Sequence, residues 1–121
     1  MKEDLISFET AALAKEQEFD IQTEWAYQNK SLIHDSQYKE LKNWNELSYA
    51  DCSAPTQSLL QKWIREKHKI DIFIIPYHLA NKKYYESVVD KYDYNITYSE
   101  YNTYEEALEI GLQESLKIIK P

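Results

Sequence analysis

The stretch that decides the fold is Ile70-Asp71-Ile72-Phe73-Ile74-Ile75-Pro76-Tyr77. Its β-branched and aromatic residues predict a strand, and apolar side chains occupy both of its faces. Side chains alternate along a strand, so Ile70, Ile72 and Ile74 share one face while Phe73, Ile75 and Tyr77 share the other. One layer of helices can cover only one of these faces, and the second face needs another contact.

Two more strands are predicted directly after this one. Residues Ala80-Asn81-Lys82 are typical of a turn, and Tyr84 to Val89 then pairs back as a hairpin strand. Residues 91–94 predict a second turn, and Asn95 to Ser99 a third, short strand. The three strands together predict an antiparallel sheet.

A helix is predicted on the N-terminal side of these strands, from Ala54 to Lys67. Pro55 fits its first turn, where a missing N–H costs nothing, and Ser53 is a candidate cap. An apolar stripe at helical spacing marks the buried side, formed by Leu59, Leu60, Trp63 and Ile64.

Two more helices are predicted near the ends of the chain. The first runs from Ser7, a plausible N-cap, to Glu18. The last runs from Thr103 to Ile119, and Thr103 with Glu106 has the spacing of a capping box.

The region between the first two helices is less regular. Residues Ile21 to Gln28 alternate between two faces and predict a half-buried strand. Residues 29–51 predict a loop with one short strand or turn within Gln37–Tyr49, because a longer structureless stretch is unusual in a compact domain.

The order of elements is helix, strand, irregular segment, helix, three strands, helix. We expect an α+β fold with an antiparallel sheet of three to five strands and helices packed mainly on one face. The length of 121 residues predicts a single domain over residues 1–121. The expected core consists of Leu60, Trp63, Ile64, Ile72, Ile74, Leu108 and Leu112.

Composition narrows the functional classes. The formal charge of −7 makes binding to a nucleic-acid backbone unlikely, since that binding needs a concentrated basic surface. A single glycine excludes a glycine-rich phosphate loop. A single cysteine excludes an internal disulfide, and no apolar run approaches membrane-spanning length. We therefore expect a cytoplasmic protein with no membrane contact.

Candidate catalytic and metal-binding residues are few. The three histidines, His34, His68 and His78, lack ligand spacing, and His68 fits a cation at a helix C-terminus better. Cys52 as a nucleophile would need a base supplied by the fold, although a nearby helix N-terminus can lower a thiol pKa. We expect no catalytic residue, no metal, no cofactor and no enzymatic activity.

Two features of the last helix have structural explanations. Glu105 and Glu106 could form a carboxylate pair for acid–base catalysis, but a helix N-terminus itself favours acidic residues. Gly111 lies in the middle of the helix, where a glycine usually lets another backbone approach closely.

The order helix, three strands, helix from Ala54 to Ile119 is also that of a double-stranded RNA-binding domain. Those domains need a lysine cluster at the start of the last helix to hold phosphates. This chain has Tyr104, Glu105 and Glu106 there, which would repel phosphate. We interpret the order as shared topology only.

Three segments carry a resemblance that covers nearly the whole chain: Ile6-Ser7-Phe8-Glu9, Ala54-Pro55-Thr56-Gln57-Ser58-Leu59-Leu60-Gln61-Lys62-Trp63-Ile64-Arg65-Glu66 and Asn102-Thr103-Tyr104-Glu105-Glu106-Ala107-Leu108-Glu109-Ile110-Gly111-Leu112. They resemble a family of small uncharacterised proteins from phage-like regions of Bacteroidetes genomes. The chain departs from the family pattern at position 18, where Glu18 replaces an expected glycine. The resemblance implies a bacterial or phage source and brings no known activity.

The second apolar face of the strand is the candidate interface. It is expected to contain Phe73, Ile75, Tyr77, Tyr85 and Val89, and such a patch usually marks an interaction with a homodimer mate or another protein. Alternatively, residues 29–51 could cover it with Trp44 and Leu47.

The most favoured function is a non-enzymatic protein-interaction or accessory module of phage-like origin. The alternatives are an acidic DNA-mimicking inhibitor and a hydrolase whose site is assembled from distant residues.

Overall fold

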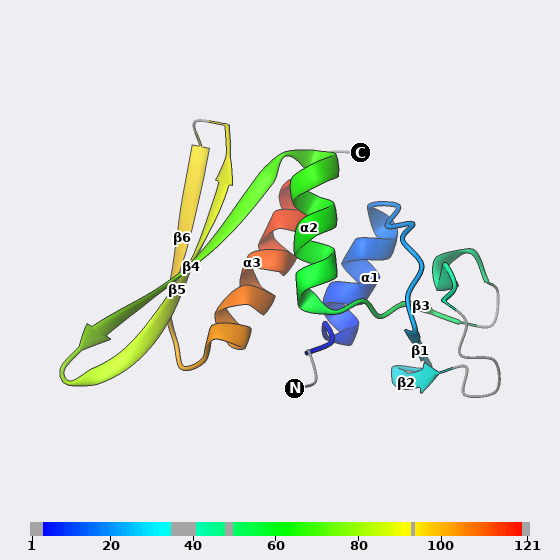
Figure 1. Cartoon of the computed structure of the whole chain (residues 1–121), viewed down its shortest axis with the longest axis horizontal. Helices are drawn as coiled ribbons and strands as arrows, with labels where there is room; N and C mark the ends of the chain where they lie inside the picture. The colour runs from blue at the N-terminus through cyan, green and yellow to red at the C-terminus, as the bar shows by residue number, and fades with distance from the viewer. Residues whose placement is uncertain (1–3, 35–40, 48–49, 93, 120–121) are drawn as a thin grey trace. The chain divides into compact units, whose positions relative to one another are not determined.

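The computed structural model describes residues 4–34, 41–47, 50–92 and 94–119 (Figure 1). It confirms the α+β class, with three α-helices and two three-stranded antiparallel sheets among these residues. The strands thus form two sheets rather than one. The chain divides into two compact units, residues 1–56 with residue 121, and residues 57–120. The single domain expected over residues 1–121 stays a prediction.

The second unit contains a sheet with both helices on one face (Figure 1). Its elements are α2 (Gln57–His68), β4 (Ile70–Leu79), β5 (Lys82–Lys91), β6 (Tyr94–Tyr101) and α3 (Tyr104–Ile118), with strand order β4-β5-β6. Both strands of the first hairpin are longer than predicted. β6 begins to pair with β5 only at Tyr85, so the hairpin tip beyond that pair is two-stranded.

A two-residue turn joins β4 to β5. Ala80 and Asn81 both have positive φ, 52° and 66°. Two such residues give the turn whose twist matches the flanking strands, which fixes the register of the hairpin. Ile72 then pairs with Val89, and Phe73 with Val88.

α3 lies very close to the sheet at Gly111. A Cβ at this position would lie 2.4 Å from Ser87 Oγ and 2.7 Å from Ile72 Cγ2. Ala107 and Ser115, one turn before and one turn after, are also fully buried. These small residues form a ridge that lets the helix approach the strands, as the lone mid-helix glycine predicted.

The caps of the helices confirm two predictions and correct one. Thr103 Oγ1 accepts a hydrogen bond from the Glu106 N–H, and the Glu106 carboxylate accepts one from the Asn102 N–H. The predicted N-cap Ser7 likewise accepts from the Thr10 N–H. Ser53 is not a cap, because it lies in a strand, and Pro55 precedes the first turn since α2 begins only at Gln57.

The predicted core is confirmed with one exception. Six of its residues are buried: Leu60, Trp63, Ile64, Ile72, Leu108 and Leu112. Ile74 is only half-buried. It pairs with Ser87 on β5, farther along the strand toward the two-stranded tip.

The first unit pairs a helix with a small sheet. Its elements are α1 (Phe8–Glu16), β1 (Trp25–Gln28), β2 (Ser31–His34), the 3₁₀ turn η1 (Trp44–Glu46) and β3 (Cys52–Ser53), with strand order β2-β1-β3. Tyr27 ties the sheet to the start of the chain, because its ring packs edge-on against Phe8 and its hydroxyl donates to the Ile6 carbonyl.

α1 ends in a left-handed residue even though that residue is not glycine. Glu18 has φ 65°, its N–H donates to the Lys15 carbonyl, and the Phe19 N–H donates to the Ala14 carbonyl. This pair of hydrogen bonds defines a Schellman motif, which normally takes glycine at the left-handed position. Glu18 therefore adopts the geometry that the expected glycine would have favoured.

The strand predicted over Ile21 to Gln28 is shorter and alternates differently. β1 begins at Trp25, and neighbours Ala26 and Tyr27 are both buried because the strand is covered on each side. The short turn predicted within Gln37–Tyr49 is confirmed by η1 at Trp44–Glu46, whereas the strand β2 at Ser31–His34 was not predicted. Residues 37–40 and 48–49 of the predicted range lie outside the described residues.

Trp44 is a central core residue of the first unit. Its ring is 2% exposed and packs in a cluster with Ala26, Ala50 and the half-buried Leu47. Its indole N–H donates to the Thr23 carbonyl.

Among the described helices, none is long and apolar enough to cross a membrane.

Candidate interaction surface

The face of the β4-β5-β6 sheet opposite the helices is the candidate functional site, and we call it the outer face. The register places on it every second residue of each strand, starting from Phe73 and its partner Val88. It comprises Asp71, Phe73, Ile75, Tyr77 and Leu79 of β4, Lys82, Tyr84, Glu86, Val88 and Asp90 of β5, and Asn95 and Thr97 of β6.

Apolar side chains on β4 are unusually exposed there. Phe73 is 50% exposed, Ile75 42% and Leu79 54%, although they alternate with the buried Ile70 and Ile72. Scattered exposed apolar residues are ordinary, but neighbours along one face form a patch of the kind that marks interaction sites.

Two of the five residues expected on this face lie on the other one. Val89 pairs with Ile72 and is 2% exposed, and Tyr85 pairs with Pro76 and packs edge-on against Tyr104 of α3. The prediction was wrong because alternation within each strand was known, but the register between strands was not. Phe73, Ile75 and Tyr77 do share the outer face.

Sequence reasoning missed three apolar or aromatic residues of the outer face, Leu79, Tyr84 and Val88. A two-residue turn at Ala80-Asn81 would have identified them, since it pairs Leu79 with Lys82 and so sets every later pair. The missing signal was the turn type, because neither residue is the glycine that usually marks such turns.

Tyr77 and Tyr84 form an ordered aromatic pair across the two strands. Their rings stack with centroids 5.8 Å apart and planes inclined by 28°. The Tyr77 hydroxyl also accepts a hydrogen bond of 2.9 Å from the Glu100 N–H. Glu100 lies where the β5–β6 register shifts, and its φ is 70°. The pair is thus held in place before any partner binds, which lowers the entropic cost of binding.

Trp44 and Leu47 were expected to cover this face from residues 29–51, of which residues 35–40 and 48–49 lie outside the described residues. Trp44 and Leu47 pack within the cluster of the first unit, and the Trp44 indole has its own hydrogen bond there. Phe73 and Ile75 remain exposed.

The hairpin tip carries two lysine–tyrosine contacts. The Lys82 amine lies 5.1 Å from the ring centroid of Tyr84, and the Lys83 amine lies 5.3 Å from that of Tyr85. A cation over an aromatic face is attracted by the ring quadrupole. These contacts hold the tip lysines against the strands.

Cys52 does not have the properties of a nucleophile. It lies in β3, 1% exposed, rather than immediately before a helix. Burial, followed by the charge of Asp51, raises the pKa of its thiol to about 11, although Lys15 acts in the opposite direction. The reactive thiolate is therefore scarce at neutral pH.

The histidines show no shared site in the described structure. His34 Nε2 lies 2.7 Å from the Glu24 carboxylate and its ring packs on Trp25. Burial lowers the pKa of His68, and Lys67 and Lys91 lower it further. The prediction that His68 is a cation at this helix end is therefore wrong. The described residues contain no group of three or more side chains that could hold a metal ion.

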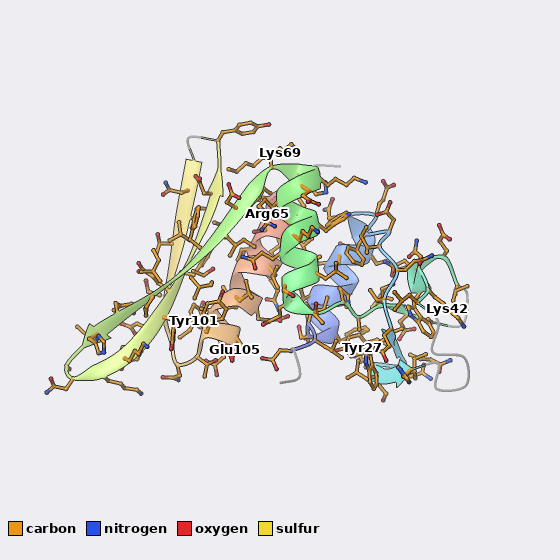
Figure 2. All side chains as sticks on the ribbon, in the orientation of Figure 1. Tyr27, Lys42, Arg65, Lys69, Tyr101 and Glu105 are labelled. Carbon is orange, nitrogen blue, oxygen red and sulfur yellow. The ribbon has the colours of Figure 1, made fainter. Side chains whose placement is uncertain are left out.

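The start of α3 is acidic and exposed, as the sequence indicated. Tyr104, Glu105 and Glu106 are all exposed in its first turn. Figure 2 labels Glu105. The Glu106 carboxylate accepts a hydrogen bond from the Asn102 N–H, just before the N-cap Thr103, and therefore has a structural role. Glu105 contributes its backbone carbonyl, which accepts a hydrogen bond from the buried Gln57 side chain.

The charge of the chain is unevenly divided between the units. Residues 1–56 contain five lysines and eleven carboxylates, a formal charge of −6, whereas residues 57–120 contain nine Lys or Arg and ten carboxylates, a formal charge of −1. Three of the nine Lys or Arg of the second unit, Lys62, Arg65 and Lys67, lie on α2, and Lys69 directly follows the helix; Figure 2 labels Arg65 and Lys69.

Comparison of the chain with protein-family models, curated proteins and solved structures finds no match in any of the three.

Proposed function

We propose that the chain is a non-enzymatic protein-interaction module, an accessory protein of the phage-like kind that its sequence resembles, and that it binds a protein partner through the outer face. The observation that carries the proposal is the row of exposed apolar residues along β4, Phe73, Ile75 and Leu79, beside the preorganised Tyr77–Tyr84 pair. Large aromatic and aliphatic side chains supply most of the binding energy in protein interfaces.

Site-specific photocrosslinking in bacterial cells that produce the chain tests this proposal. A photoreactive phenylalanine analogue at Phe73 should give a discrete crosslinked protein. The matched control places the analogue at Lys62, an exposed position on α2. The proposal fails if position 73 gives no adduct, or if both positions give the same adducts.

An acidic DNA-mimicking inhibitor is the second candidate, and the charge of the first unit favours it. All eight of its described carboxylates are exposed: Asp4, Glu9, Glu16, Glu18, Asp20, Glu24, Glu46 and Asp51. A crosslinker at Glu16 that captures a nuclease or DNA-binding protein in a low-salt lysate, but not when moderate salt is added before irradiation, would support this candidate instead.

A further inference from the structure

The outer face is acidic as well as apolar. The register places three carboxylates on it, Asp71, Glu86 and Asp90, against one amine, Lys82, among the described residues of the three strands. The Lys82 amine is held over the Tyr84 ring at the hairpin tip. The rest of the face therefore has a negative potential, within a unit whose formal charge is only −1.

Glu86 is the central charge of this face. It pairs with Ile75 across the strands, and its neighbours on the same side of β5 are Tyr84 and Val88. The residue is half-buried, and no hydrogen bond or ion pair within the described structure involves its carboxylate. Glu86 is thus a charge with no partner among the described residues, beside the apolar or aromatic residues Ile75, Tyr84 and Val88.

Covering this face would remove water from the Glu86 carboxylate. A carboxylate that loses its hydration without gaining a partner is strongly destabilising, so a purely apolar partner would bind poorly. A partner that supplies a cation turns the same charge into a source of affinity and specificity.

The same charges argue against two other occupants. A second copy docked face to face would bring three carboxylates toward three carboxylates, and like charges that meet across an interface oppose association. A nucleic acid would be repelled for the same reason.

We infer that the occupant of the outer face is an apolar protein segment that carries an arginine or a lysine, and that this cation pairs with Glu86 while apolar side chains beside it contact Phe73, Ile75 and Val88. The inference rests on the proposed function. An arginine suits the site best, since its guanidinium can bind a carboxylate through two hydrogen bonds and stack on a tyrosine ring. Tyr77 provides such a ring near Glu86, whereas the Tyr84 ring already has Tyr77 stacked on it and the Lys82 amine over it.

Selection from a displayed library of random twelve-residue peptides tests the inference with the full chain as bait. Peptides enriched on the unmodified chain should contain Arg or Lys among apolar residues. Their affinity should fall by about tenfold or more for Glu86→Gln, as expected for loss of a charged hydrogen-bonded pair. Glu66→Gln, which removes an exposed carboxylate on α2, is the matched control and should leave affinity unchanged.

A charge-reversed bait sharpens the test. Glu86→Arg should select peptides with Asp or Glu among apolar residues. Circular dichroism and urea unfolding of each variant establish that the bait is folded.

The outcomes separate this inference from the proposed function. Two results overturn the inference alone: enriched peptides that lack a cation, and peptides whose affinity for Glu86→Gln equals that for the parent chain. In both cases the peptides must still lose affinity for Phe73→Asp. No enrichment at all, or binding that survives Phe73→Asp, overturns both. Concentration-dependent self-association that Phe73→Asp abolishes would identify a second copy as the occupant and also overturn the inference.

Discussion

The hydroxyl oxygen of Tyr77 on β4 accepts a hydrogen bond of 2.9 Å from the backbone N–H of Glu100 on β6, across the central strand β5. The bond ties one edge of the sheet to the other on the outer face. It also satisfies the N–H of a residue that lies at the irregularity of the β5–β6 register. The face that we propose as a binding site is therefore braced by one of its own tyrosines.

Tyr77→Phe should lower the free energy of unfolding by about 0.5–1.5 kcal/mol, the usual net contribution of one hydrogen bond. Urea unfolding measures the change. Amide exchange should become faster at Glu100 in particular. Tyr92→Phe is the control, since its ring is 80% exposed at a turn, and it should change neither quantity.

Gly111→Ala should destabilise the protein by about 1–2 kcal/mol, because the clash of an added methyl group exceeds the gain of about 1 kcal/mol in helix propensity. The new Cβ would meet Ser87 Oγ and Ile72 Cγ2. Adding Ser87→Ala removes the first contact and should restore part of the loss in thermal or urea unfolding. A Gly111→Ala variant more stable than the parent would contradict the observed close approach of α3.

Glu18→Gly should stabilise the protein by about 0.5–1 kcal/mol, because glycine adopts a left-handed conformation without the steric cost of a Cβ. Glu18 has φ 65° at the end of α1. Ala12→Gly, in the middle of α1, should instead destabilise by about 1 kcal/mol. Equal effects of the two substitutions in urea unfolding would rule out the left-handed cap as the cause.

Cys52 should not react with a thiol reagent at pH 8 while the chain is folded. Its thiol is buried, and its pKa is raised to about 11 from an ordinary 9.0. Because the pKa is raised in the folded state, the associated stability is present below pH 9 and is lost as the pH rises toward 11. Reaction of the native chain as fast as that of the urea-unfolded chain would contradict the burial.

His68 should make the protein less stable in mild acid. Burial and two lysines lower its pKa below the ordinary 6.5, so the unfolded chain binds the proton more tightly. The free energy of unfolding should therefore fall as the pH drops below 6.5 and level off below the folded-state pKa. The fall should be smaller in His68→Gln. An NMR titration that places the pKa above 6.5 would reverse the sign and refute this assignment.

The sequence by itself determined the local elements of the second unit. Helical stripes, the Thr103–Glu106 box and two-faced alternation from Ile70 to Tyr77 are local signals, because each depends on residues a few positions apart. The same alternation showed that Phe73, Ile75 and Tyr77 would share a face. The lone Gly111 indicated a close packing contact, since only packing explains a glycine inside a good helix.

Only the tertiary structure decided which face each strand turned toward the helices and how the strands were grouped. Val89 and Tyr85 turned inward because a turn of two non-glycine left-handed residues set the register, and that conformation has no clear sequence signature. The separate small sheet around Trp44 arose from contacts between residues far apart in the chain, such as Trp44 with Thr23. The position of Glu86 at the centre of the outer face likewise follows from pairing between strands, which a pattern within one strand does not encode.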